Sequence, residues 1–228
     1  MQKRKYDRRS LTAAAVCSLL EAALVIWCVA GMLFYRGDGN MSVTGLYAFI
    51  YFTVDSNLLS AVCGIVTAVC AFRAMGMVRR RQKEGDSLPD VFPRWAVLLQ
   101  YSGTAAVSVT LLTVLLFLGP NLGYASMFAG KNLYLHLICP ILSIITLCFL
   151  IRAYKISMAE TSISVLPTFF YAIVYVRQTV FLGYENGGWH DFYGFNHWNT
   201  WPLAALIMLL GTWIIGLVLR AVHNRFAL

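Results

Sequence analysis

Residues 51–72 read YFTVDSNLLSAVCGIVTAVCAF, an apolar run that is long enough to cross a lipid bilayer but begins with a cluster of polar side chains. Bilayer hydrocarbon is about 30 Å thick, which takes roughly 20 residues of helix. Five other stretches meet this need. The six predicted membrane-spanning helices are Leu11–Tyr35, Val43–Phe72, Trp95–Leu118, Leu133–Ile151, Ile163–Leu182 and Trp201–Leu219.

The composition supports the same interpretation. Of the 228 residues, 59% are hydrophobic and 12% are charged, whereas soluble domains carry about 25% charged residues. The predicted fold class is therefore all-α, a polytopic membrane protein with residues 1–228 in one six-helix domain.

The basic residues indicate how the predicted helices are oriented. In a six-helix topology, 15 of the 18 Lys and Arg residues fall on the side of the two termini. Cytoplasmic connections carry an excess of such residues, so we predict that both termini are cytoplasmic and that the protein lies in the cell membrane. The net charge of +8 then reflects topology and attraction to anionic lipid headgroups at the cytoplasmic face. We expect no nucleic-acid partner, and the sequence leaves the oligomeric state open.

Unusual polar side chains lie at similar depths in the predicted helices, in the outer third of the bilayer. Thr53, Ser56 and Asn57 share one face of the second helix, whereas Asp55 points elsewhere. His136 lies near the outer end of the fourth helix. A threonine hydroxyl becomes a nucleophile when a base takes its proton, and histidine suits that task near neutral pH. Thr53 and His136 are therefore the candidate catalytic pair.

Other polar side chains are candidates for binding a substrate. Amides stabilise a developing oxyanion, and a guanidinium holds a carboxylate or a phosphate. The candidate substrate-binding or oxyanion residues are Ser56, Asn57, Asn132, Tyr175, Arg177 and Gln178. For Arg177 we favour a structural ion pair with Asp55 over ligand binding.

Three segments occur in an order that resembles a known family. YFTVDSNLLSAV (51–62), NLYLHLICP (132–140) and GGWHDFYGF (187–195) are similar to the androgen-induced and androgen-dependent membrane proteins, whose characterised members hydrolyse fatty acid esters of hydroxy fatty acids. The resemblance covers most of the chain. It implies a multipass fold with an intramembrane threonine nucleophile and a histidine partner, at Thr53 and His136 here. The implied substrate is a lipid ester within the bilayer, and we expect no cofactor.

A metal-dependent membrane hydrolase is one alternative. His136, His190, Asp191 and His197 would supply its ligands, because zinc commonly takes three such side chains. The flexible aromatic segment that carries the last three gives no regular ligand spacing.

A small transporter or receptor is the other alternative. Asp55, Arg177 and Glu21 would form its ion or proton path, as ionisable residues inside membranes often do.

Overall fold

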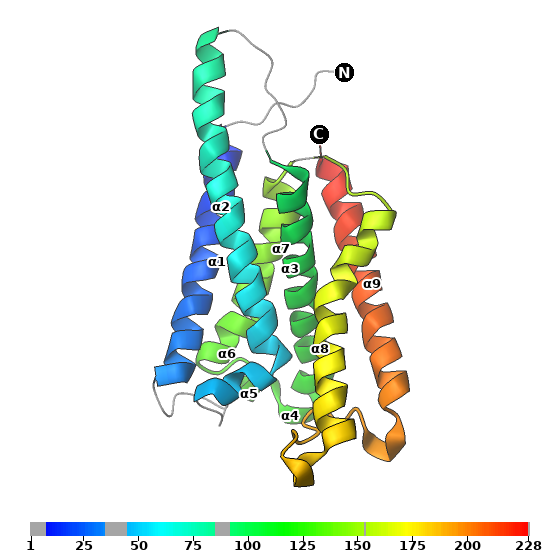
Figure 1. Ribbon diagram of the computed structural model, residues 1–228. Helices are drawn as coiled ribbons and strands as arrows, with labels where there is room; N and C mark the ends of the chain where they lie inside the picture. Colours follow the sequence, from blue (N-terminus) through cyan, green and yellow to red (C-terminus); the bar gives the residue numbers. More distant parts are fainter. Residues whose placement is uncertain (1–7, 35–44, 85–91, 153, 228) are drawn as a thin grey trace.

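The computed structural model describes residues 8–34, 45–84, 92–152 and 154–227 of the chain (Figure 1). The regular structure of these residues is entirely helical, and six helical segments are long and apolar enough to cross a membrane. They run Arg8–Phe34, Phe52–Arg79, Arg94–Leu122, Lys131–Leu150, Ala159–Leu182 and Trp201–Phe226. The predicted all-α polytopic membrane fold with six spans is therefore confirmed.

The first, second and sixth spans are single α-helices, and the other three are built from shorter pieces. The single helices are α1 (Arg8–Phe34), α2 (Phe52–Glu84) and α9 (Trp201–Phe226). The third span joins α3 (Arg94–Thr113), η2 (Val114–Leu118) and α4 (Gly119–Leu122). The fourth joins α6 (Lys131–Leu133), η3 (Tyr134–Ile138), α7 (Cys139–Ile145) and η4 (Thr146–Leu150). The fifth joins η5 (Ala159–Val165), α8 (Leu166–Val176) and η6 (Arg177–Leu182), and the short helices η1 (Gly45–Ile50) and α5 (Tyr124–Met127) lie between spans.

The second helix differs most from its predicted bounds. It begins at Phe52, because the separate helix η1 occupies the apolar residues before it. The predicted start at Val43 lies outside the described residues. At its other end the helix continues past Phe72 to Glu84, since the residues that follow are mostly strong helix formers such as Ala, Met, Arg, Gln, Lys and Glu. Hydropathy thus located the span but not the length of the helix.

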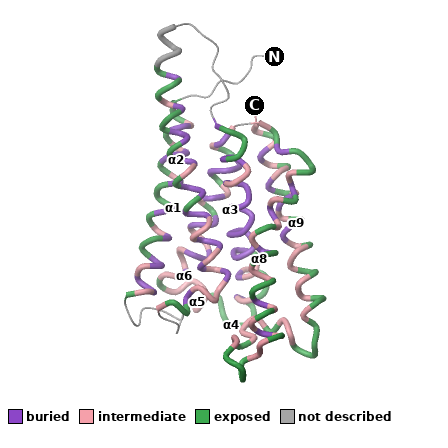
Figure 2. Tube along the Cα trace, in the orientation of Figure 1, coloured by how far each residue is buried: buried purple, intermediate pink, exposed green. Residues whose placement is uncertain are grey.

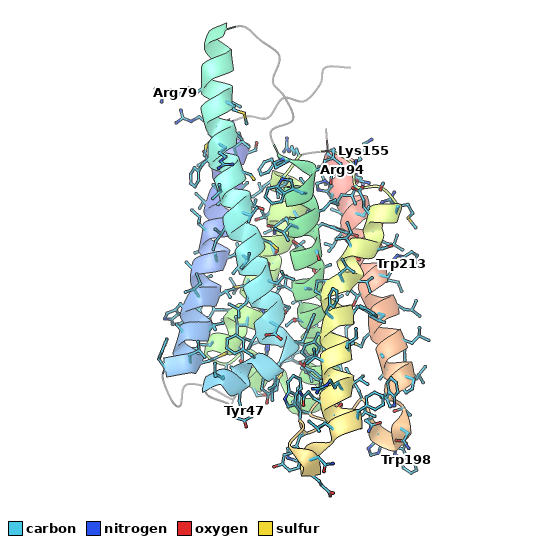
Figure 3. All side chains as sticks on the ribbon, in the orientation of Figure 1. Tyr47, Arg79, Arg94, Lys155, Trp198 and Trp213 are labelled. Carbon is cyan, nitrogen blue, oxygen red and sulfur yellow. The ribbon has the colours of Figure 1, made fainter. Side chains whose placement is uncertain are left out.

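Successive spans run in opposite directions, so α1 begins and α9 ends at the same end of the bundle (Figure 1). Arg79, Arg94 and Lys155 lie at this end, which we name the terminal end, and Tyr47 and Trp198 lie at the opposite, loop end (Figure 3). An excess of basic residues at one membrane surface, and Trp and Tyr rings at the membrane–water interfaces, are typical of a membrane protein. The even number of crossings agrees with the predicted topology.

The first four spans hold most of the buried residues, and the last two cover them on one side (Figure 2). In the apolar windows of the first four spans 44–50% of residues are buried, compared with 17% in the last two. Small residues bring the buried helices together. A Cβ atom on Gly64 would lie 3.0 Å from the carbonyl oxygen of Ser18, and one on Gly103 would lie 2.7 Å from Cys63 Sγ. Such close contacts drive helix association in lipid, where apolar burial alone contributes little.

A network of hydrogen bonds crosses the middle of the buried helices. The hydroxyl of Ser143 in α7 bonds with Ser60 of α2 at 3.0 Å and with Thr104 of α3 at 2.9 Å. It also accepts a bond of 3.2 Å from Gln100 Nε2. Ser60 in turn donates to the carboxyl group of Glu21 in α1. All five side chains are fully buried, so the network joins four spans through groups that lipid cannot satisfy.

Replacing Ser143 by alanine tests this network. The change removes the shared partner of three buried polar groups, so we expect the free energy of unfolding to fall by about 1–2 kcal/mol, measured by unfolding in mixed detergent micelles. Ser108→Ala is the matched control, because the buried Ser108 hydroxyl donates only to the Thr104 carbonyl of its own helix, at 2.7 Å. Equal losses in the two variants would show that the network does not stabilise the bundle.

Candidate active site

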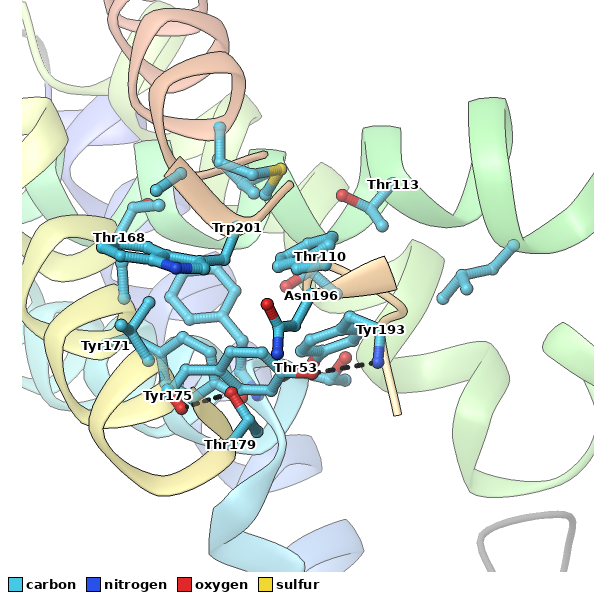
Figure 4. A pocket seen from close by; sticks show the side chains of 18 of the residues that line it. Thr53, Thr110, Thr113, Thr168, Tyr171, Tyr175, Thr179, Tyr193, Asn196 and Trp201 are labelled. Carbon is cyan, nitrogen blue, oxygen red and sulfur yellow. Dashed lines mark hydrogen bonds between the residues drawn. The ribbon is translucent and has the colours of Figure 1, made fainter. Parts of the chain in front are cut away.

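A pocket lies at the loop end, between the start of α2, the third span, α8 with η6, and the start of α9 (Figure 4). The connection 183–200 supplies the remaining wall, and the empty space of the pocket, together with its open mouth, is about 760 Å³. Its wall is mostly aliphatic and aromatic, and none of the residues that line it is charged or a histidine. Five threonines from three spans line it: Thr53, Thr110, Thr113, Thr168 and Thr179. Such a pocket suits an apolar ligand with few hydrogen-bonding groups.

Thr53 differs from most of these threonines in its hydrogen bonding. The hydroxyl of Thr110 bonds with Ser56 at 2.9 Å, and that of Thr179 donates to the carbonyl of its own helix at 2.8 Å. Thr168 accepts from Thr212 at 3.3 Å. The hydroxyl of Thr53 bonds with none of the described residues, whereas its backbone carbonyl accepts two bonds. A pocket ligand can therefore reach the Thr53 oxygen without displacing a protein partner.

Asn196 brings a side-chain amide to the same pocket (Figure 4). Its Oδ1 atom is buried and has no hydrogen-bond partner among the described residues. A buried polar atom without a partner is uncommon in proteins. Thr53 and Asn196 are thus two polar groups of the pocket that are left for a ligand.

An aromatic cluster around Tyr175 closes the pocket at the loop end. The Tyr175 hydroxyl donates to Asp191 at 2.6 Å and accepts from the backbone N–H of Tyr193 at 3.1 Å. Asp191 also accepts from the backbone N–H groups of Phe195 at 3.0 Å and Asn196 at 2.8 Å. One carboxylate therefore fixes the connection 183–200 to α8.

Tyr193 ties the same connection to α2. Its hydroxyl accepts the backbone N–H of Phe52 at 3.2 Å, one of the N–H groups that helix geometry leaves unpaired in a first turn. Burial raises the pKa of Tyr193 to about 12, so the phenol is neutral at physiological pH. The connection 183–200 therefore holds the start of α2, which carries Thr53, through the Tyr193 hydroxyl.

His136 lies in η3 of the fourth span and does not line the pocket. Its side chain is buried, and Nδ1 lies 2.8 Å from the carbonyl oxygen of Met127 in α5. Because a carbonyl oxygen only accepts hydrogen bonds, Nδ1 carries the proton and Nε2 is the basic nitrogen. The imidazole is therefore oriented by a backbone group, as the base of a nucleophile–base pair commonly is.

Asn57 connects the two candidate catalytic residues through the backbone. Its Nδ2 atom donates to the carbonyl oxygen of Thr53 at 2.7 Å and to that of Leu135, the neighbour of His136, at 3.0 Å. The turns that carry Thr53 and His136 are thus adjacent, although no direct hydrogen bond joins the two side chains. The Asn57 side-chain amide therefore links two helices through its Nδ2 atom.

The structure does not bring Asp55 and Arg177 together as an ion pair. Within the described residues the pair closer than 4.0 Å is Arg94–Glu160, at 2.7 Å near the terminal end. Asp55 faces a groove between α2 and α8, whereas Arg177 is exposed on η6. The two side chains therefore lie on helix faces that do not face each other.

The other predicted binding residues divide between the pocket and the surrounding helices. Tyr175 lines the pocket, and Ser56 supports it through its bond to Thr110. Asn132 and Gln178 do not line it; the carbonyl of Gln178 accepts the backbone N–H of Trp189 at 3.2 Å. Asn132 is buried in α6, and Gln178 contacts the connection 183–200 through its backbone.

The four residues of the metal-dependent alternative do not come together. His136 is held against α5, and Asp191 is occupied by its three donors. The His190 ring stacks on Tyr184 with centroids 3.4 Å apart, and the His197 ring contacts Trp198. In the described part of the chain no group of three His, Cys, Asp or Glu side chains is placed to hold a metal ion.

The pocket residues of the third span, the sixth span and the connection 183–200 were not predicted from the sequence. Thr110 and Thr113 lie three residues apart, which places them on one helix face, and this spacing was a usable signal. Asn196 and Trp201 reach the pocket through the fold of the connection 183–200, which has no periodic pattern. No local motif points to them.

Comparisons with models of known protein families, with curated proteins and with solved structures found no match. The resemblance to the androgen-induced and androgen-dependent membrane proteins stays a prediction from three short segments. The structure by itself defines the class: an integral membrane protein of six spans with an uncharged pocket at one end.

The role of Asp191 can be tested directly. Asp191→Ala removes the acceptor of three hydrogen bonds, so we expect faster amide hydrogen exchange, by about tenfold or more, across residues 183–200. Glu185→Ala is the matched control, since this exposed carboxylate belongs to the same connection and makes no hydrogen bond or ion pair with another described residue. Unchanged exchange in Asp191→Ala would mean that another contact fixes the connection.

Proposed function

We propose that this protein is an intramembrane lipid-ester hydrolase in which the acyl chain of the substrate occupies the pocket and Thr53 is the nucleophile. The observation that carries the proposal is the Thr53 hydroxyl, which opens into an uncharged pocket and bonds with no described residue. The resemblance of the sequence to a family of threonine hydrolases supports the same assignment.

The lining of the pocket supports binding of an acyl chain. Aliphatic and aromatic side chains form most of its wall, and no charged side chain lines it. Walls formed by residues such as Val109, Val176 and Met208 offer contacts to a hydrocarbon chain. The ester group then lies where the hydroxyl of Thr53 and the amide of Asn196 reach it.

His136 is the general base in this proposal. Its Nε2 atom is basic because Nδ1 donates to the carbonyl of Met127. Asn57 holds the turn that carries His136 beside the turn that carries Thr53. Since His136 does not line the pocket, the proton of Thr53 reaches Nε2 through one bridging water. General bases act either directly or through such a water.

The proposed reaction has two steps. Thr53 Oγ1 attacks the ester carbonyl while its proton moves to His136, and the side-chain N–H of Asn196 (Nδ2) donates a hydrogen bond to the oxyanion. The alcohol leaves with that proton, and an acyl-threonine remains. Water, activated by His136, then hydrolyses the acyl-threonine to release the fatty acid and restore Thr53.

The proposed setting is the cell membrane, with the terminal end in the cytoplasm. The basic residues at that end support this orientation. The pocket would then lie in the outer leaflet, where a lipid ester reaches it from the bilayer. Anionic lipid headgroups would contact the basic terminal end.

A fluorophosphonate probe tests the nucleophile. We expect the wild type in membranes to form an adduct on Thr53, located by mass spectrometry, and Thr53→Ala to lose both the adduct and ester hydrolysis, by about a hundredfold or more. Thr113→Ala is the matched control, because Thr113 lines the same pocket and also has no hydrogen bond to a described side chain. Full hydrolysis by folded Thr53→Ala would overturn the proposal.

A second variant tests the base. Glutamine at position 136 keeps an amide that can donate to the Met127 carbonyl but has no basic nitrogen. We expect His136→Gln to lose hydrolysis by about a hundredfold with little change in thermal unfolding. Wild-type turnover in this variant would show that another residue is the general base. If the probe still forms an adduct on Thr53, the assignment of Thr53 as nucleophile stands.

A further inference from the structure

A second cavity, which we name the α2–α8 groove, lies beside the pocket and faces outward between these two helices. Its empty space, together with the part that is open to the outside, is about 880 Å³. The rings of Phe52 and Tyr171, with centroids 5.1 Å apart, line both cavities and form the wall between them. Phe170 of the groove is 62% exposed, so the groove opens sideways toward the surrounding lipid.

Asp55 is the single charged residue in the lining of this groove. It lies in the first turn of α2, where a carboxylate interacts favourably with the helix N-terminus. Its side chain forms no ion pair or hydrogen bond with another described residue. A carboxylate near the membrane interior is costly unless an opposite charge accompanies it. The groove therefore has a negative charge that is left for a ligand.

Aromatic rings from η1, α2, α8 and the connection 183–200 line the groove. Phe49, Phe52, Phe170, Tyr171 and Trp189 line it together with Asp55. Faces of aromatic rings attract cations, and several rings around one site are how proteins recognise quaternary ammonium groups. A carboxylate among five aromatic side chains combines two attractions for an organic cation, whereas an anion or a strongly hydrated metal ion gains little there.

The direction of the groove indicates an amphiphile rather than a small cation. Phe49 and Trp189 lie at its loop-end side, near the expected membrane surface, Asp55 lies in the first turn of α2, and Leu59 lies one helical turn deeper. A ligand in this groove thus meets a charge near the surface and apolar side chains below it. That order matches a lipid headgroup above its acyl chain.

We propose that the α2–α8 groove binds a membrane amphiphile by its ammonium headgroup, with Asp55 as the counter-charge and the aromatic side chains as a cage. The proposal goes beyond hydrolysis at Thr53 and stands without it, because it concerns binding alone. Access from the groove to the pocket would require the Phe52 and Tyr171 rings to separate.

Calorimetric titration tests the groove. The full chain in dodecyl maltoside micelles is titrated with decyltrimethylammonium, and the uncharged decyl glucoside serves as the comparison ligand. We expect saturable binding of the ammonium amphiphile and at least about tenfold weaker binding to Asp55→Asn. Glu185→Gln removes an exposed carboxylate at the same end of the molecule and should leave the affinity unchanged.

Further variants separate the possible outcomes. Thr53→Ala should bind decyltrimethylammonium as the wild type does, so that failure of the hydrolase proposal leaves this result intact. Trp189→Leu should weaken binding several-fold even where Asp55→Asn folds poorly. Equal affinity of wild type and Asp55→Asn, equal binding of decyl glucoside, or free choline binding as tightly as the amphiphile would each overturn the proposal.

Discussion

Inside a bilayer a polar group finds its hydrogen bonds only within the protein, and this constraint organises the whole bundle. The backbone meets it by forming helices. The side chains meet it at the centre of the bundle, where Ser143 bonds to Ser60, Thr104 and Gln100. Helices that bring these groups together must approach closely, which the small residues of the first three spans permit. The buried half of the molecule is therefore held in one arrangement.

Under the same constraint, a polar group that has no partner in the protein is left for a ligand. Thr53 and Asp55 lie two residues apart in α2, and each faces a different cavity. Thr53 opens into the enclosed pocket, and Asp55 lines the groove that faces lipid. The Phe52–Tyr171 pair separates the two. The polar side chains at the start of α2 thus line two cavities, the pocket and the α2–α8 groove, rather than one.

The sequence predicted the fold because hydropathy and the distribution of basic residues follow from the bilayer alone. It could also indicate Thr53 and His136, since polar groups in a span stand out against an apolar background. It could not show how helices rotate about their axes, and this rotation decides that Asp55 and Arg177 stay apart and that Asn57 bonds to Leu135. Nor could it place Asn196 or Asp191, whose positions depend on a connection without periodic pattern.

The central claim is that the pocket holds the acyl chain of a lipid ester beside Thr53. Photocrosslinking with a long-chain ester that carries a diazirine at the end of its acyl chain tests this claim most directly. The account predicts adducts on pocket residues such as Val109, Val176 and Met208, suppressed by excess unlabelled ester. Adducts confined to the outward face of α9, for example on the half-exposed Leu206 and Leu210, would contradict it.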